Sequence, residues 1–480
     1  MKKKLTLPQG CALLLAIFFL LGLGFYAVAH NQLCYRINTT DALSPTNNVG
    51  EITAGMVVEQ AFTTSDDTIQ YLDIFFQAYA RENTGTLNVT ILDRADPLFQ
   101  QSIEVSELQD NEYYTLAPAL TSVAGKQLTL RITSDDCVSG SAVTVAYGDS
   151  MNAGRGQVAV ETPEKIHVNG AEQAGQLCMR VATVETLWFG FYYWYFLLAA
   201  AALLAVYLIY LVHCQRKGKT CVGLRFLAAL TRYSFLIQQL VSRDFKTKYK
   251  RSVLGIFWSF LNPLLTMLVQ YIVFSTLFKS DIPNYPVYLL TGIVCFTYFS
   301  ESVNQCLSSI TGNATLITKV YVPKYIYPLS KTLSSGINLL LSLLPLFLVM
   351  LVTGSRLTLA ITLLPFGLTC LFMFCLGFGM LMATAMVFFR DTQFLWGVFS
   401  MLWMYLTPIF YPESIIPNQL LGLYKMNPLY HIIRFFRTIL IDGVSPEPKA
   451  YLLCLIASVV PLVLGMFVFK KKQDKFVLYI

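Results

Sequence analysis

Six of the nine residues from 243 to 251, RDFKTKYKR, carry a charge, and five of those six are basic. A long apolar run begins directly afterwards, at Val253. Basic side chains of this density hold the cytoplasmic end of a membrane-spanning helix at the charged membrane surface. The cluster therefore predicts a topological anchor. Whether it also has a functional role depends on the elements around it.

Other chemistries have weaker support in the sequence. The string CQRKGKT at 214–220 ends in Gly-Lys-Thr like a phosphate-binding loop, but the first glycine of that pattern would fall on His213. The four histidines are scattered, and Cys214 and Cys221 have no second Cys/His pair nearby, so no metal site is expected. We expect no catalytic residues, no metal and no nucleotide bound by this chain.

The composition is that of a multi-pass membrane protein. Of 480 residues, 55% are hydrophobic and 13% are charged, whereas soluble chains are about a quarter charged. Residues 30–186 hold 8 Lys/Arg against 20 Asp/Glu, and the remainder holds 27 against 8. Because basic residues flank spans on the cytoplasmic side, the acidic block is expected on the outer side.

The acidic block shows the pattern of a β-sandwich. Segments such as TLNVTI and QLTLRI alternate apolar and polar residues between turn signals. Similar hexapeptides, QLCYRI at 32–37 and QLCMRV at 176–181, predict first and last strands that pair. We expect an antiparallel, jelly-roll-like sandwich. A disulfide between Cys34 and Cys178 is one prediction, with Cys137 as the rival partner.

Apolar runs predict about eight spans with both chain ends on the cytoplasmic side. Residues 1–29 are expected to form an uncleaved anchor, and a signal peptide cleaved after Ala29 is the alternative. Residues 214–252 form a basic linker with an amphipathic helix at 225–242. Segment 412–449 is apolar but broken by prolines and a glycine, which favours a re-entrant structure. The expected spans are 10–29, 187–213, 253–278, 285–310, 329–353, 358–388, 394–411 and 450–469.

The sequence from 240 to 278 closely resembles the start of ABC-2 type permeases that export O-antigen, capsule and teichoic acid. Their pattern is a basic Arg-Asp-Phe stretch, then Ser-x-Leu-Gly-x-x-Trp, then Pro-Leu. LTPIFYPESIIP at 406–417 and NPLYHIIRFFRTILIDG at 427–443 are similar to two later family motifs. The resemblance covers roughly 222–480, so residues 253–480 are expected to be a six-span permease core. The first motif is met here by Arg243, Asp244, Phe245, Tyr249, Ser252, Leu254, Gly255, Trp258, Pro263 and Leu264.

The resemblance implies a homodimer with two separate ABC ATPase subunits, which bind the ATP and magnesium. It implies a bacterial cytoplasmic membrane protein, with 30–186 outside, that moves a lipid-linked glycan outward. Membrane lipids are expected partners, and nucleic acid is not. The basic cluster would then transmit ATP-driven motion or meet lipid pyrophosphate, with plain anchoring as the alternative. Residues implied for ATPase coupling are Arg243, Asp244, Phe245, Lys246, Leu316, Ile317, Lys319 and Tyr321.

A second set of residues is predicted to line the channel or meet substrate. Aromatic rings in the spans can stack on the apolar faces of sugars, although lipid contact and packing are the ordinary alternatives. Glu301 lies deep in an apolar run and is expected either to pair with a neighbouring helix or to face the channel. A charge at membrane depth, as on the two arginines that follow, is costly unless it serves a site or a partner. Arg434 and Arg437 either meet an anionic group or reach the outer surface. The set is Trp258, Tyr271, Glu301, Trp403, Tyr405, Phe410, Tyr411, Arg434 and Arg437.

Other functions compete with glycan export. An ABC-2 type exporter of a small molecule or lipid is the closest alternative, and a membrane glycan-binding or structural protein is another. A membrane glycosyltransferase would need clustered carboxylates, and a sensor would need a cytoplasmic output domain. For the β-domain, glycan binding competes with a structural or partner-docking role, because the domain has no tryptophan and would repel an anionic polymer.

Overall fold

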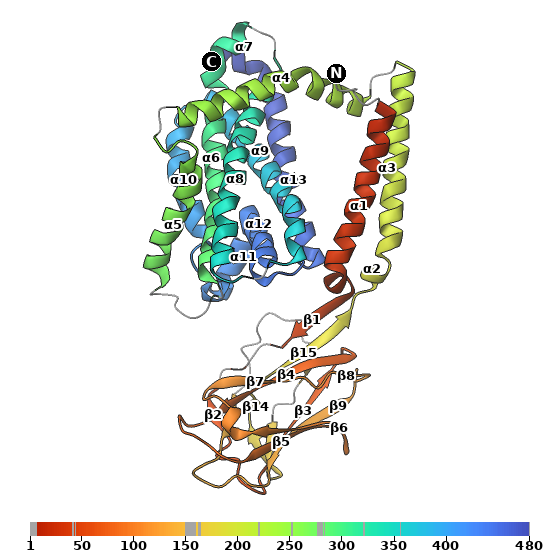
Figure 1. The fold of residues 1–480 in the computed structure, drawn as a ribbon, viewed down its shortest axis with the longest axis vertical. Helices are drawn as coiled ribbons and strands as arrows, with labels where there is room; N and C mark the ends of the chain where they lie inside the picture. The colour runs from red at the N-terminus through yellow and green to blue at the C-terminus, as the bar shows by residue number, and fades with distance from the viewer. Residues whose placement is uncertain are drawn as a thin grey trace. The chain divides into compact units, whose positions relative to one another are not determined.

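The computed structural model describes residues 7–479 except 41–42, 44, 149–159, 162–164, 219–220, 251–252, 276–281, 283, 320–321 and 356. Two compact units make up the chain. Leu33–Tyr192 is the β unit, and Met1–Gln32 together with Tyr193–Ile480 is the helical unit. Figure 1 draws both units with their element labels.

The helical unit consists mainly of long apolar helices. The long helices are α1 (Leu7–Cys34), α3 (Tyr193–Arg216), α4 (Val222–Tyr249), α5 (Phe257–Ser275), α6 (Tyr285–Leu307), α8 (Ile326–Val352), α9 (Leu364–Phe388) and α13 (Pro448–Lys472). Shorter ones are α7 (Ala314–Lys319), α10 (Thr392–Leu406), α11 (Asn418–Met426), α12 (Pro428–Arg437) and α14 (Phe476–Tyr479). Single turns are η2 (Thr311–Asn313), η3 (Leu359–Leu363), η4 (Glu413–Ile415), η5 (Thr438–Asp442) and η6 (Gln473–Lys475).

Seven helical stretches of the described chain are long and apolar enough to cross a membrane. The expected span at 394–411 corresponds to α10, which has only 15 residues. At 1.5 Å per residue, α10 is about 22 Å long, less than the ~30 Å hydrocarbon core. The seven stretches are Leu7–Cys34, Tyr193–Arg216, Phe257–Phe274, Tyr285–Leu307, Ile326–Val352, Leu359–Phe388 and Pro448–Tyr479.

Helix α6 is the most buried of these spans and runs through the main apolar core with α8, α9, α12 and α13. Helices α9 and α13 approach so closely that a Cβ placed on Gly465 would meet the Gly377 carbonyl. Glycine at both positions permits this approach, because it has no side chain to separate the backbones. The bundle therefore combines a large apolar core with one backbone-to-backbone helix contact.

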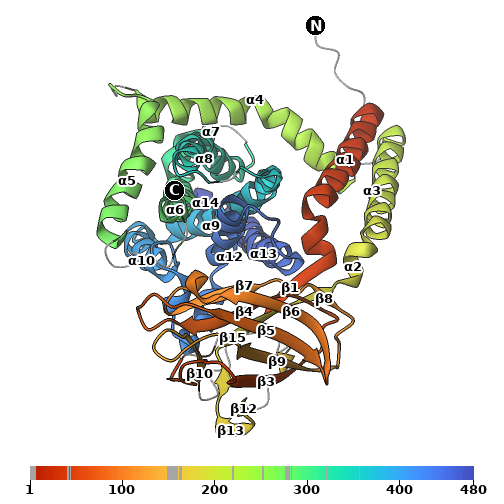
Figure 2. The same ribbon diagram turned by 60° about the horizontal axis from the view of Figure 1, so that its bottom comes forward.

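Helix α4 runs across the ends of the other helices, in both views (Figures 1 and 2). The amphipathic helix expected at 225–242 is longer than predicted and continues to Tyr249. Lys246 and Lys248 therefore lie in its last turn, where positive charge is favoured by the helix dipole. The C-terminal ends of α6, α9 and α13 meet here, and Lys470, Lys471 and Lys472 end α13. We call this end of the bundle, with the C-terminal half of α4, the basic end.

The β unit is a sandwich of two antiparallel sheets, as its alternating pattern predicts; Figure 2 shows its layers. One sheet has the order β1-β15-β4-β10-β14, and the other has β13-β12-β3-β9-β5-β6. Inward side chains of β3, β4, β5 and β9 share one apolar core. The strands are β1 (Tyr35–Thr39), β2 (Asn47–Asn48), β3 (Val57–Thr64), β4 (Thr68–Gln77), β5 (Thr86–Asp93), β6 (Asp96–Glu104), β7 (Glu112–Leu116), β8 (Leu120–Thr121), β9 (Gln127–Ser134), β10 (Thr144–Gly148), β11 (Val160–Glu161), β12 (Lys165–Val168), β13 (Ala171–Ala174), β14 (Gln176–Leu177) and β15 (Met179–Thr186), with η1 (Val105–Glu107) and α2 (Trp188–Phe191).

The first and last long strands pair as the two hexapeptides predict, but the expected disulfide is wrong. Strands β1 and β15 are antiparallel, with Tyr35 opposite Thr186. Cys34 therefore lies beside Leu187, whereas Cys178 precedes the other end of β15. The eight residues of β15 separate the two sulfur atoms by roughly 26 Å, far beyond disulfide reach. The rival partner, Cys137, is also a thiol, close to two carbonyl oxygens.

Candidate coupling site and polar cavity

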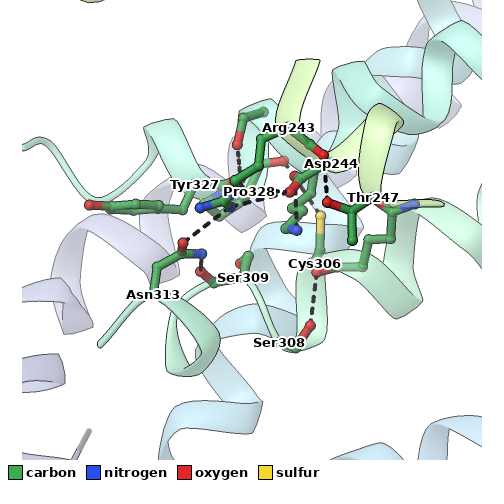
Figure 3. Close-up of polar contacts among 12 residues, drawn as sticks. Arg243, Asp244, Thr247, Cys306, Ser308, Ser309, Asn313, Tyr327 and Pro328 are labelled. Carbon is green, nitrogen blue, oxygen red and sulfur yellow. Dashed lines mark hydrogen bonds and ion pairs between the residues drawn. The ribbon is translucent and has the colours of Figure 1, made fainter. Parts of the chain in front are cut away.

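Asp244 lies at the centre of a polar network at the basic end. Its Oδ2 is 2.8 Å from the Lys331 Nζ of α8, and its Oδ1 is 3.2 Å from the Arg243 Nη2. Arg243 also donates to the Asn313 Oδ1 of η2, at 3.4 Å. Figure 3 shows Arg243, Asp244 and Asn313 gathered between α4 and the turn at 311–313. We call these four residues the Asp244 network.

The ion pair in this network is mostly shielded from solvent. The Asp244 side chain is 12% exposed and the Lys331 side chain is 18% exposed. Removal of one partner from such a pair leaves the other charge uncompensated, which is strongly destabilising. The pair therefore fixes the C-terminal half of α4 to the start of α8. Lys331 was not predicted, although a lysine inside an apolar run is the same signal that singled out Glu301.

Glu301 forms a second network with its neighbours. Its Oε1 accepts hydrogen bonds from Lys248 Nζ at 2.7 Å, Asn338 Nδ2 at 2.8 Å and Gln305 Nε2 at 2.9 Å. Asn338 in turn accepts from the Tyr249 hydroxyl at 2.9 Å. These residues, the Glu301 network, join α4, α6 and α8. The structure therefore gives Glu301 partners on two neighbouring helices, and Glu301 also lines the cavity described next.

Both networks border one polar cavity of about 840 Å³. Ten of the twelve lining side chains carry a hydroxyl, amide or charged group, and the cavity is open to the surface, where Thr297, Asn304 and Ser308 are exposed. Such groups hydrogen-bond a hydroxyl-rich molecule and are poor partners for an apolar one. Two apolar side chains, Phe296 and Met404, complete the wall. The lining residues are Asp244, Thr247, Lys248, Phe296, Thr297, Ser300, Glu301, Asn304, Gln305, Ser308, Lys331 and Met404.

The six-residue helix α7 lies beside the Asp244 network. Leu316 and Ile317 are half-buried and pack against the apolar cluster of Leu240, Tyr327 and Phe476. The exposed residues of α7 are instead Thr315, Thr318 and Lys319. The apolar residues of α7 are therefore turned inward and its polar residues outward. Tyr321, also predicted for coupling, lies outside the described residues, as does Ser252; Phe245 is half-buried, and Lys246 is exposed.

The predicted channel aromatics fall into two groups. Trp258, Tyr271 and Tyr405 are exposed, with 40–50% of their surface accessible. Phe410 is buried and stacks on Phe274, with ring centroids 5.3 Å apart. The Trp403 Nε1 donates to Asn427 Oδ1 at 2.9 Å, and the Tyr411 hydroxyl donates to the Tyr405 carbonyl at 2.7 Å. Tyr405, Phe410 and Tyr411 lie together, since the Tyr405 and Phe410 ring centroids are 6.1 Å apart and Tyr411 hydrogen-bonds to Tyr405.

The two arginines of the segment after α11 differ in their surroundings. Arg434 is 60% exposed, and its Nη1 lies 3.8 Å from the Glu413 Oε2. Arg437 is buried, with its guanidinium 3.4 Å from the centroid of the Tyr288 ring. It donates to the carbonyl oxygens of Pro408 at 2.8 Å and Ile409 at 3.1 Å. These contacts make Arg437 a packing residue that joins α12 to α6 and to the chain after α10.

Seven candidate spans and a long helix across their basic end indicate a multi-pass membrane protein (Figure 1). Comparison with known proteins matches residues 235–441 to the family described as ABC-2 type transporter. The chain belongs to the ABC-2 type transporter permeases and is related to those of O-antigen and capsule export. Members of this family bind no nucleotide themselves, and membership implies partnership with an ATPase subunit.

Three relatives illustrate this relationship. An O-antigen export system permease protein of Myxococcus xanthus is 30% identical over 256 residues, which cover 53% of this chain and 98% of the relative. Another, of Klebsiella pneumoniae, is 29% identical over 245 residues, 50% and 93% of the two chains. A capsule polysaccharide export inner-membrane protein of Neisseria meningitidis is 25% identical over 250 residues, 51% and 93% of the two chains.

Proposed function

We propose that this chain is the permease subunit of an ABC exporter that moves a lipid-linked polysaccharide outward across the bacterial cytoplasmic membrane. The polar cavity is the observation that carries this proposal. A glycan offers many hydroxyl groups, and the walls offer hydroxyl, amide and charged partners for them. The names of the relatives, which refer to O-antigen and capsule polysaccharide, support the same class of cargo.

The Asp244 network supports a mechanism for coupling to a separate ATPase. In this mechanism the exposed residues of α7 dock on the ATPase subunit, and Asn313 directly precedes α7 in the chain. A shift of α7 reaches Arg243 through its hydrogen bond to Asn313, and then reaches α8 through the Asp244–Lys331 ion pair. Because α8 and α4 border the cavity, the same shift changes the cavity's width. The working unit is a homodimer with two ATPase subunits.

Depletion of this chain from cells, followed by measurement of the glycan at the cell surface, is the direct test of the proposal. Cells depleted of this chain should accumulate lipid-linked glycan inside and lose it from the cell surface, as measured by extraction and by surface lectin binding. Unchanged surface glycan, together with loss of export of a small molecule or a lipid, would favour the alternative cargo and contradict the proposal.

Substitutions in the cavity test the cargo more sharply. Asn304→Leu combined with Thr297→Val removes exposed hydrogen-bonding groups from the wall. This variant should assemble with its ATPase and export glycan more slowly. Met404→Leu is the matched control, because it changes the same cavity without the loss of a polar group. Equal export by the two variants would show that polar contacts in the cavity do not serve the glycan.

A charge exchange tests the coupling route. Asp244→Lys alone and Lys331→Asp alone each place two like charges together, so both should uncouple ATP hydrolysis from export. The double variant restores the pair with its direction reversed and should recover export in part. If the double variant were no better than either single one, the ion pair would not transmit the motion. Lys319→Glu on the exposed face of α7 should weaken copurification of the ATPase.

A further inference from the structure

Helices α1 and α3 pack tightly along one half of their length. The Tyr26 and Tyr193 rings stack with centroids 5.1 Å apart, and the Tyr193 hydroxyl donates to the Gly22 carbonyl at 2.9 Å. A Cβ on Gly22 would meet the Leu197 side chain, so the two helices are in close contact there. This half of the helix pair leaves no room for another molecule.

The other half of the same pair is hollow. A groove of about 410 Å³ lies between the first two turns of α1 and the last three turns of α3. Its wall includes the small residues Cys11, Ala12 and Ala205, which are too short to fill the space between the two backbones. The groove is mainly apolar along its length, but His213 and Arg216 also line it. Its shape and lining suit a hydrocarbon chain.

The charges at this groove are of one sign. Arg216 is the last residue of α3, and Lys217 follows it. Neither α1 nor α3, as described, contains an aspartate or a glutamate. In the sequence, Lys2, Lys3 and Lys4 precede α1. An apolar groove that ends in positive charge, with no acidic residue on the described parts of its two helices, is complementary to a molecule with a hydrocarbon chain and an anionic head.

We propose that this groove binds one anionic phospholipid of the cytoplasmic leaflet, with an acyl chain between α1 and α3 and the phosphodiester against Arg216. Basic residues at the cytoplasmic ends of spans attract anionic headgroups, and pockets between helices can make that attraction specific. The lipid fills a hollow that the two helices leave open. The site belongs to the helix pair that precedes α4 and does not depend on the cargo of the permease.

Lipid titration of the full-length protein tests this site. The purified protein in neutral detergent is titrated with palmitoyl-oleoyl phosphatidylglycerol or phosphatidylcholine, and bound lipid is counted by native mass spectrometry. The wild type should bind its first phosphatidylglycerol in preference to phosphatidylcholine. Arg216→Gln should lower that preference about fivefold, the effect of one basic residue on an anionic headgroup. Ala205→Phe, which fills the groove, should remove the first bound lipid of either kind.

Lys470→Gln is the matched control, because it removes one positive charge from the inner end of α13 without touching the groove. The control should keep the wild-type preference. The proposal is overturned if Arg216→Gln behaves like the wild type, or if Lys470→Gln loses as much preference. It is also overturned if a polyprenyl phosphate displaces phosphatidylglycerol from the first site. Should Ala205→Phe fail to purify as a single species, Ala12→Leu on the opposite wall replaces it.

Discussion

Replacement of Arg437 by methionine should loosen the packing of α12 against α6. The guanidinium satisfies the carbonyl oxygens of Pro408 and Ile409, which belong to an irregular segment after α10. Methionine has a similar length but no donor, so both oxygens would stay buried without that partner. Each such loss costs about 1–3 kcal/mol, and the lost contact with the Tyr288 ring adds about 2 kcal/mol.

One effect opposes this loss. The arginine charge is itself buried, and its removal recovers desolvation free energy, which in other proteins has made such replacements neutral or stabilising. Here three backbone carbonyls surround the guanidinium, because the Tyr288 oxygen is also 3.5 Å from Nη2. The free-energy cost of leaving these carbonyl oxygens without a donor should exceed the desolvation free energy that is recovered. We expect a net destabilisation of about 3 kcal/mol, which for a unit of about 320 residues corresponds to a fall of roughly 4–5 °C in melting temperature.

Thermal unfolding of the purified protein measures this effect, and Arg434→Met is the matched control. Arg434 is mostly exposed and makes a long ion pair with Glu413 and a 3.4 Å hydrogen bond to the Tyr430 hydroxyl, so its loss should cost less than about 1 kcal/mol. Cys295 is buried in α6, and its labelling by a membrane-permeant maleimide gives a local readout. Equal melting temperatures for the two variants, with unchanged labelling of Cys295, would refute the assignment of Arg437 as a packing residue.

Three further predictions concern other parts of the chain. Gly465→Ala should lower the melting temperature, because a methyl group would collide with the backbone of α9, whereas Gly397→Ala, with nothing within 4 Å, should not. The Arg81 guanidinium holds the pKa of Glu51 at about 2, below its ordinary 4.5. Its contribution to sandwich stability should therefore be complete above about pH 4.5 and fade toward pH 2, so that urea unfolding of wild type and Glu51→Gln converges at low pH. Burial raises the pKa of Cys178 to about 11, so a water-soluble maleimide at pH 7 should label it only after unfolding; rapid labelling of the folded protein would contradict this.

The sequence predicts the elements of this fold well, because local patterns carry the information. Apolar runs locate the spans, and period-two alternation locates strands such as β5 and β9. Span length is less certain from hydropathy alone. The run at 394–411 stays apolar through Pro408, but its helix ends at Leu406, before a proline that cannot continue it.

The contacts of the candidate site are harder to predict, because they join residues far apart in the chain. The Asp244–Lys331 pair spans 87 positions, and neither residue's local surroundings name the other. The same limit applies to Arg437, whose motif suggests a surface charge while its contacts are backbone carbonyls of another segment. Ile317 is a third case. The family resemblance implies a role in ATPase coupling, but the side chain is half-buried against the cluster around Tyr327, and its local sequence does not reveal that contact.

The pairing of β1 with β15 has a consequence for how such a chain can change over generations. The Leu187 amide donates to the Cys34 carbonyl at 2.8 Å, so the chain enters and leaves the sandwich at a single point. A peptide of a few residues would bridge that point if 35–186 were removed, and the count and direction of the following helices would not change. The sandwich can thus be acquired, lost or exchanged for another fold by one genetic insertion or deletion. The helices of the permease that follows would keep their number and their direction across the membrane.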